Sequence, residues 1–282
     1  MKICNIVTDR ETYLGVVTDN GIVVVDAWNS TDAYVRDPSP AKYETLAHAV
    51  SGAQGIPFGS TPPIGPALLK PGKVICIGLN YRRHAEETGA DIPTTPVVFS
   101  KFSDSVAASG AVISIPKTTR QLDYEAELAI VIGREAQNVS EEESLEYIFG
   151  YCNANDISAR DLQFVTSQWL LGKTGSGFAP IGPYIKTADQ VPNPNNLAIR
   201  MYRNGELVQN SNTADMIFSC REIIAYLSRH MVLRAGDIIL TGTPEGVIMG
   251  QDPAERKWLA SGDHLMVEIE GLGQLTNSLI ED

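Results

Sequence analysis

Residues 122–133 read Leu122-Asp-Tyr-Glu-Ala-Glu-Leu-Ala-Ile-Val-Ile-Gly133. The second half of this segment is rich in apolar and β-branched residues and ends at a glycine, which predicts a β-strand. Because side chains alternate between the two faces of a strand, we expect Glu125 and Glu127 on one face, and Tyr124 and Leu128 on the other.

Two neighbouring carboxylates repel each other and resist burial. A divalent cation would remove both penalties, and ligands that are all oxygen suit Mg²⁺, Mn²⁺ or Ca²⁺ better than Zn²⁺. The alternative is a solvated strand end, which for an isolated Glu-x-Glu pair is the more common case. The remainder of the chain decides between these alternatives.

Composition excludes several classes of protein. The chain has 282 residues, of which 43% are hydrophobic and 20% charged, as expected for a globular protein with a sizeable core. Its net charge of −12 disfavours nucleic acids and anionic membranes as partners. No segment has the roughly 20 apolar residues that a membrane-spanning helix needs, and the N-terminus lacks the apolar region of a secretory signal.

The cysteines indicate the cellular compartment. The 4 cysteines are widely spaced and form no Cys-x-x-Cys pair, so we expect neither a zinc site nor a disulfide framework. Cys76 and Cys152 lie in apolar runs and are expected to be buried. A cytoplasmic protein is the simplest interpretation.

The distribution of turn residues predicts two domains. Three short apolar runs occupy residues 1–30, and Asn20-Gly21 between two of them predicts a hairpin. Residues 55–71 are rich in proline and glycine, Pro62 among them, and form the expected boundary. We expect a small N-terminal β-rich domain over residues 1–70 and a main domain over residues 71–282.

Short strands bounded by turns dominate the main domain, which predicts a β-rich α+β fold. The Asn204-Gly205 dipeptide predicts a second hairpin. Helices are expected over residues 43–50, over 80–89 with Asn80 as the N-cap, over 140–148, from Asp156 to about Leu171, and over 218–233.

Several polar residues have chemical potential, although each has a simpler interpretation. His84 and Glu87 share a helical face, so Glu87 can accept the ring N–H and leave the other nitrogen to take a proton; the alternative is a solvated pair. Asp156 could be only an N-cap and Lys173 only a solvated loop residue. The turn at residues 242–246 could expose backbone N–H groups to an anion.

Some functions lack the required motif. The sequence contains no P-loop and no Gly-x-Gly-x-x-Gly after a strand, so nucleotide binding is not supported. It also lacks the Gly-x-Ser-x-Gly elbow of many serine hydrolases.

Taken together, these residues resemble the fumarylacetoacetate hydrolase family from about Lys73 to the C-terminus. The motifs that carry the resemblance are, in order, Gly78-x-Asn80-Tyr81-x-x-His84-x-x-Glu87, Asp123-Tyr124-Glu125-Ala126-Glu127-Leu128, Asn155-Asp156-x-x-Ala159-Arg160-Asp161-x-Gln163, Gly172-Lys173, Pro180-x-Gly182-Pro183 and Gly242-Thr243-Pro244-x-Gly246.

The resemblance implies a mixed β-sandwich roll that forms a homodimer. It also implies one Mg²⁺ or Mn²⁺ per subunit, held by Glu125, Glu127 and Asp156. The segment from Asn80 to Gly89 would act as a lid that brings His84 and Glu87 over the site. The residues expected to hold the substrate carboxylate and the developing enolate are Arg160, Gln163, Lys173 and Thr243.

The implied activity is hydrolysis of a C–C bond in a small 2,4-diketo acid such as an acylpyruvate, with His84 and Glu87 activating water. One alternative is a 2-oxo acid decarboxylase or isomerase that acts on oxaloacetate or on a ring-cleavage product; loss of CO₂ would leave the same enolate as hydrolysis. A second alternative is a non-catalytic dimer that binds oxo acids. Retention of His84 and Glu87 speaks against it, since binding alone requires neither.

The chain departs from the family pattern at one position. Many members carry an aspartate three positions after the loop lysine, where this chain has Ser176. This change affects the expected substrate preference and not the three metal ligands. Lys101 also stands where the family often has a lysine.

Overall fold

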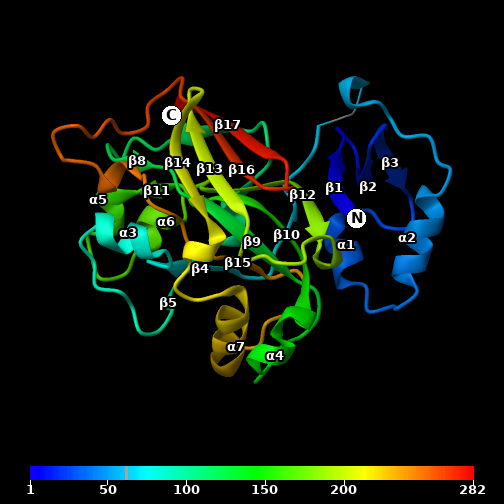
Figure 1. Ribbon diagram of the computed structural model, residues 1–282. Helices are drawn as coiled ribbons and strands as arrows, with labels where there is room; N and C mark the ends of the chain where they lie inside the picture. Colours follow the sequence, from blue (N-terminus) through cyan, green and yellow to red (C-terminus); the bar gives the residue numbers. More distant parts are fainter. Residues whose placement is uncertain (61–62) are drawn as a thin grey trace.

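A large sheet runs through the whole protein. It is seen in a computed structural model that describes residues 1–60 and 63–282, so Thr61 and Pro62 of the predicted boundary loop lie outside the described residues (Figure 1). Within these ranges the sheet has ten strands, in the order β3-β2-β1-β12-β10-β9-β15-β4-β5, with β6 paired to β12. The strands are β1 Lys2–Val7, β2 Thr12–Thr18, β3 Gly21–Val25, β4 Val74–Gly78, β5 Val97–Lys101, β6 Val106–Ala107, β9 Ala126–Ile132, β10 Ile148–Asn155, β12 Ala179–Thr187 and β15 Ile238–Leu240.

A second sheet packs against the first, which gives the mixed β-sandwich architecture that the sequence predicted. Its order is β14-β13-β16-β17-β7. The strands are β7 Val112–Ile115, β13 Ala198–Arg203, β14 Glu206–Asn212, β16 His264–Ile269 and β17 Gln274–Glu281, while β8 Leu122–Asp123 and β11 Ser158–Ala159 form a separate short pair. Both predicted hairpins are confirmed, since β2 pairs with β3 and β13 pairs with β14.

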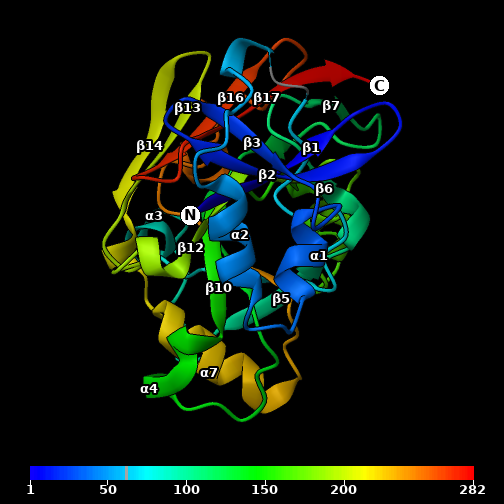
Figure 2. The same ribbon diagram turned by 90° about the vertical axis from the view of Figure 1, so that its right-hand side faces the viewer.

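The helices are short and lie around the sheets (Figures 1 and 2). They are α1 Thr31–Arg36, α2 Lys42–Val50, α3 Arg82–Glu87, α4 Glu141–Ser144, α5 Arg160–Gln163, α6 Leu170–Lys173 and α7 Cys220–His230. The longest of them, α7, begins at a capping box in which Ser219 and Glu222 satisfy each other's backbone N–H groups. None of the helices in the described ranges has the length and apolar character required to span a bilayer.

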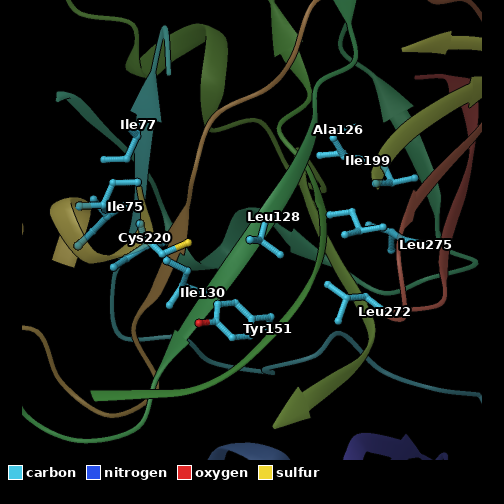
Figure 3. Packing of buried hydrophobic residues seen from close by; sticks show 14 of the residues in the cluster. Ile75, Ile77, Ala126, Leu128, Ile130, Tyr151, Ile199, Cys220, Leu272 and Leu275 are labelled. Atoms are coloured by element: carbon cyan, nitrogen blue, oxygen red, sulfur yellow. The ribbon is translucent and has the colours of Figure 1, made fainter. Parts of the chain in front are cut away.

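The central strand β9 is buried on both faces. Alternate residues Ala126, Leu128 and Ile130 belong to the core between the two sheets, while Ala129 and Val131 belong to a core that reaches α1 and α2. Figure 3 shows Leu128 and Ile130 on β9 among side chains from both sheets. All four cysteines are buried and unpaired, as predicted for Cys76 and Cys152.

The N-terminal strands extend the large sheet. Strand β1 pairs with β12, with Lys2 opposite Lys186, and β2 and β3 follow at the edge. Helices α1 and α2 pack beside them (Figure 2). The division at residue 70 stays a prediction.

Three predicted elements differ from the structure. The strand predicted over residues 122–133 is interrupted between β8 and β9, at Tyr124 and Glu125. The helix predicted from Asp156 to Leu171 is wrong, because a strand and two single-turn helices occupy this segment. Gly172 explains the turn back: a Cβ there would lie 2.4 Å from the backbone nitrogen of Gln163, so only glycine lets α6 fold onto α5.

The third difference concerns Asn80, which does not cap α3. The N-cap is Tyr81, and it makes no side-chain capping bond. The Asn80 amide instead donates to the carbonyls of Phe218 and Thr241, at 3.1 and 2.7 Å. It therefore joins the start of the predicted lid to two distant segments.

A buried asparagine connects the two sheets. Asn153 on β10 donates from Nδ2 to the carbonyls of Gly182 and Leu272, at 3.1 and 3.0 Å, and accepts at Oδ1 from the backbone N–H of Ile269 at 2.9 Å. The two bonds to Ile269 and Leu272 cross from the large sheet to the end of β16 and to the turn that follows it.

We predict that Asn153→Ala lowers the free energy of unfolding by about 3 kcal/mol, because it leaves buried backbone groups in both sheets without partners. Chemical denaturation measures this change. The control is Asn210→Ala, on an exposed position of β14, which should alter stability by less than about 0.5 kcal/mol. Equal stability of the two variants would contradict the assigned role of Asn153.

Candidate active site

One cavity of about 650 Å³ brings together most of the residues singled out from the sequence. It lies between the start of β9, helix α3, the α5–α6 segment and the loop after β15. The predicted residues that line it are His84, Glu87, Glu125, Glu127, Arg160, Gln163, Lys173 and Thr243. Asp156, the remaining predicted residue, is fully buried beside them.

Strand pairing brings the three predicted metal ligands together. On the antiparallel strands β9 and β10, Ala126 lies opposite Asn155. Asp156, the next residue, donates its backbone N–H to the Glu125 carbonyl at 2.9 Å. Glu125, Glu127 and Asp156 consequently offer carboxylate oxygens that lie within 4.8 Å of one another.

Two cations neutralise part of this cluster. Lys173 Nζ bridges Glu125 Oε2 and Asp156 Oδ2, at 2.9 and 3.0 Å. Arg160 lies 2.7 Å from Glu125 Oε1. Burial opposes ionisation of Glu125, but Lys173 and Arg160 outweigh it and lower its pKa to about 2. Burial also disfavours the charged amine of Lys173, yet Asp156 and Glu125 raise its pKa, so the ammonium form is retained.

Glu127 has a different environment. Its Oε2 accepts a hydrogen bond from the Gly242 N–H at 2.6 Å, but in the described part of the chain it forms no ion pair with a cationic side chain. Burial, followed by the charges of Asp156 and Glu125, raises its pKa well above the ordinary value. A buried carboxylate without a cation, beside two others, is a donor set that a divalent cation would complete.

Lys101 supports the cluster from behind. Its ammonium lies 2.6 Å from Asp156 Oδ1 and donates to the carbonyls of Ile157 and Phe178, at 2.9 and 2.8 Å, and to that of Lys173. These contacts fix the orientation of Asp156. The sequence signal for Lys101 was that it stands where the family often has a lysine, which predicted no contact with Asp156.

Asp123 belongs to the same motif as Glu125, but nothing in the sequence predicted a role for it. Its Oδ2 accepts from Arg160 Nε at 3.0 Å, and its carboxylate also accepts the N–H groups of Ile248 and Met249, at 2.9 and 3.0 Å. Asp123 therefore holds the Arg160 guanidinium against Glu125 and anchors the loop after β15.

The expected pair on α3 is formed. His84 Nδ1 lies 2.9 Å from Glu87 Oε1, and His84 is buried. Glu87 also accepts from the Gly246 N–H at 2.9 Å. The backbone N–H groups of Gly242 and Gly246 thus bind the protein's own carboxylates, so these two donors of the turn are already occupied.

The remaining predicted substrate ligands hold each other in place at the cavity wall. Arg160 donates from one terminal nitrogen to Gln163 Oε1 at 2.9 Å. Thr243 Oγ1 accepts from Gln209 Nε2 at 3.0 Å. Their polar atoms are therefore oriented before any ligand binds.

Comparisons with known proteins agree with this geometry. The family described as fumarylacetoacetate (FAA) hydrolase C-terminal matches residues 73–280. The protein named oxaloacetate tautomerase fahd2, mitochondrial, of Xenopus laevis is 38% identical over 274 residues, covering 92% of this chain and 85% of its own.

Two solved structures are similar over the whole chain. Fumarylacetoacetate hydrolase (EaFAH) from Exiguobacterium antarcticum has a TM-score of 0.83 and 33% identity, with 100% of both chains covered. Maleylpyruvate hydrolase from Sphingobium sp. SYK-6, in complex with manganese (II) ion and pyruvate, has a TM-score of 0.83 and 26% identity, covering 100% of this chain and 99% of its own. Because the Xenopus protein is named as mitochondrial, the cytoplasmic localisation stays a prediction, as does the homodimer.

We predict opposite effects on stability when Glu125 and Glu127 are each replaced by glutamine. In the presence of a chelator, Glu127→Gln should leave the unfolding temperature equal to or above that of the wild type, because the variant no longer buries an unpaired carboxylate. Glu125→Gln should instead lower the free energy of unfolding by about 3 kcal/mol, because Lys173 and Arg160 lose their partner. Thermal unfolding with and without Mn²⁺ measures both effects, and Mn²⁺ should stabilise only the wild type strongly.

The advantage of Glu127→Gln should grow with pH. Because folding raises the pKa of Glu127, the folded wild type binds the proton more tightly than the unfolded chain and loses stability as pH rises through the folded pKa. The glutamine variant lacks this loss. A pH-independent difference between the two proteins would contradict the assigned environment.

Proposed function

The chain belongs to the fumarylacetoacetate hydrolase family, and on this premise we propose that it is a Mg²⁺- or Mn²⁺-dependent enzyme that interconverts the keto and enol forms of oxaloacetate. One observation carries the proposal: a His–Glu pair and a buried cluster of three carboxylates with a lysine share one cavity. The name of the Xenopus relative supports the choice of reaction.

The donor set supports a divalent metal. Glu125, Glu127 and Asp156 would hold the ion, in keeping with the manganese in the maleylpyruvate hydrolase structure. When bound, such an ion acts as a Lewis acid that stabilises negative charge on the oxygens of a 2-oxo acid.

Cationic and polar side chains complete the substrate site. Lys173 keeps its proton because Asp156 and Glu125 raise its pKa, so it presents a positive donor where the enolate oxygen develops charge. Arg160, Gln163 and Thr243 line the same cavity and would orient the substrate carboxylate. Their positions are fixed by the contacts described above, which limits reorganisation during the reaction.

His84 is the proposed acid–base group. Glu87 accepts the Nδ1 hydrogen, which leaves Nε2 unprotonated and able to remove a proton from C3 of the substrate. The electron pair of the C–H bond becomes the C2–C3 double bond of the enolate, and a proton returned to the C2 oxygen gives the enol. Glu87 is itself held by a hydrogen bond from the Gly246 N–H, and this bond keeps its carboxylate in position to accept the Nδ1 hydrogen of His84.

Hydrolysis of an acylpyruvate is the second candidate, and the similar maleylpyruvate hydrolase structure favours it. In that reaction His84 would take a proton from water, which attacks the distal carbonyl, and pyruvate would leave as its enolate. Decarboxylation of oxaloacetate would use the same enolate without a water molecule. The carboxylate cluster, Lys173 and His84 could serve tautomerisation, hydrolysis and decarboxylation alike. The reaction products must therefore distinguish the three reactions.

We predict that His84→Ala lowers kcat/KM roughly 100- to 10,000-fold, because the proton acceptor is lost, while the Kd for Mn²⁺ changes less than about twofold. Enol–keto conversion of oxaloacetate and isothermal titration with Mn²⁺ measure the two quantities. The control is His264→Ala, at an exposed position distant from the cavity lining, which should keep full activity.

Products identify the reaction. Metal-stripped protein with Mg²⁺ or Mn²⁺ added back is tested in parallel on oxaloacetate and acetylpyruvate. Metal-dependent enol–keto conversion without loss of CO₂ is the expected result. Acetate and pyruvate from acetylpyruvate alone would replace the tautomerase by the hydrolase, and CO₂ and pyruvate from oxaloacetate above the rate of the free metal would replace it by the decarboxylase.

A further inference from the structure

The cavity is larger than oxaloacetate requires. Oxaloacetate has about nine non-hydrogen atoms, which occupy roughly 270 Å³ even at the ~30 Å³ that each water takes in the liquid. The cavity holds about 650 Å³. More than half of it therefore extends beyond a four-carbon substrate that is bound at the carboxylate cluster.

One wall of this outer part is aromatic. Trp169 packs edge-on against Phe99 and Phe164, with ring centroids 5.3 and 6.4 Å apart. Gly78 allows this arrangement, because a Cβ there would lie 2.7 Å from the Trp169 ring. Phe164 keeps 52% of its surface exposed at the rim. An aromatic wall that is left exposed suits an apolar group, which oxaloacetate does not have.

Residues 249–253 and Arg256 form another part of the cavity lining. Gly250 packs directly on the lid, since a Cβ at this position would lie 2.6 Å from the Glu87 carboxyl carbon. Five further residues of this wall line the cavity, and they are Met249, Gln251, Asp252, Pro253 and Arg256. The outer part of the cavity thus begins beside the proposed acid–base pair.

Arg256 brings a positive charge to this apolar region. It is half-buried, and its Nε donates to the Gln251 carbonyl at 3.0 Å, while its guanidinium lies 6.0 Å from the Trp258 ring centroid. Among the described residues it forms no ion pair with an acidic side chain. Asp252 is the acidic residue on the same wall, and its Oδ1 accepts from the Ala254 N–H at 2.9 Å within its own turn.

We propose that Arg256 is a specificity-determining residue that binds a second carboxylate at the far end of the substrate. The ligand class is a 2-oxo dicarboxylic acid with an apolar spacer that lies along Phe99, Phe164 and Trp169. This inference rests on the proposed function only in that the 2-oxo acid end binds at the carboxylate cluster. A guanidinium fits such a carboxylate through two parallel N–H donors.

Two acids of equal chain length, neither of which can be hydrolysed or decarboxylated by the reactions considered above, test the subsite. They are 2-oxoheptanedioate, with a carboxylate at the far end, and 2-oxoheptanoate, with a methyl group there. Titration calorimetry on Mn²⁺-loaded protein gives their affinities. The wild type should bind the dicarboxylate roughly 10- to 100-fold more tightly, the range expected for a charge-assisted hydrogen bond.

Arg256→Gln should remove this preference by weakening the dicarboxylate alone, and leave the affinity for 2-oxoheptanoate unchanged. The matched control is Lys257→Gln, which removes the same charge from the adjacent, exposed position outside the cavity lining. It should keep the preference. Asp252→Asn should increase it, because a negative charge leaves the same wall.

Three outcomes would overturn the proposal: equal affinities in the wild type, no binding of either acid, or an equal loss of preference in Arg256→Gln and Lys257→Gln. Turnover of oxaloacetate is measured separately on the same proteins. A wild type that prefers the dicarboxylate but does not turn over oxaloacetate would refute the proposed reaction and retain the subsite.

Discussion

The fold depends on balancing charge that it has buried. Four carboxylates, of Asp123, Glu125, Glu127 and Asp156, lie at the same end of the central strands with three cations, of Lys101, Arg160 and Lys173, and all seven residues are buried. Removing a partner from such a group leaves an uncompensated charge in a medium of low dielectric constant. Three of the carboxylates have cations within 3.0 Å, whereas Glu127 has only the Gly242 N–H. The excess negative charge therefore lies at Glu127, where a bound divalent cation would neutralise it.

The same contacts also organise the backbone. Lys101 ends β5, Arg160 begins α5 and Lys173 ends α6, so these cations join their own segments to carboxylates on β8, in the break between β8 and β9, and just after β10. Lys101 further binds carbonyls on both sides of the α6–β12 loop. Because these segments are far apart in the sequence, the site forms only when the large sheet is complete. Stability and chemistry thus share one set of interactions.

The sequence correctly predicted features that depend only on residues close together in the chain. The alternation of Glu125 and Glu127, the Asn-Gly hairpins and the helix start at residue 140, where the Ser140 side chain accepts from the Glu143 N–H, all follow from the backbone of a few residues. The segment from Asp156 to Leu171 was predicted incorrectly because Gly172 packs on Gln163, a tertiary contact that overrides helical propensity. Asp123 and Lys101 acquire their roles from Arg160 and Asp156, which lie 37 and 55 residues further along the chain, a separation that no local spacing rule reveals.

The loop over residues 242–256 connects the carboxylate cluster, the His84–Glu87 pair and the outer part of the cavity. Between Gly242 and Arg256 the chain binds Glu127 through one N–H, Glu87 through another and Asp123 through two more, before it forms the outer wall of the cavity. A change in this loop therefore reaches a proposed metal ligand, the acid–base pair and the substrate rim together. The proposed tautomerisation of oxaloacetate and the alternative hydrolysis of an acylpyruvate would use the same carboxylates, lysine and His84, so the group that the substrate carries beyond its 2-oxo acid end would distinguish these two reactions. This loop both binds Glu87, the partner of His84, and lines the outer part of the cavity, so the acid–base pair and the place proposed for the far end of the substrate are joined through one segment of backbone.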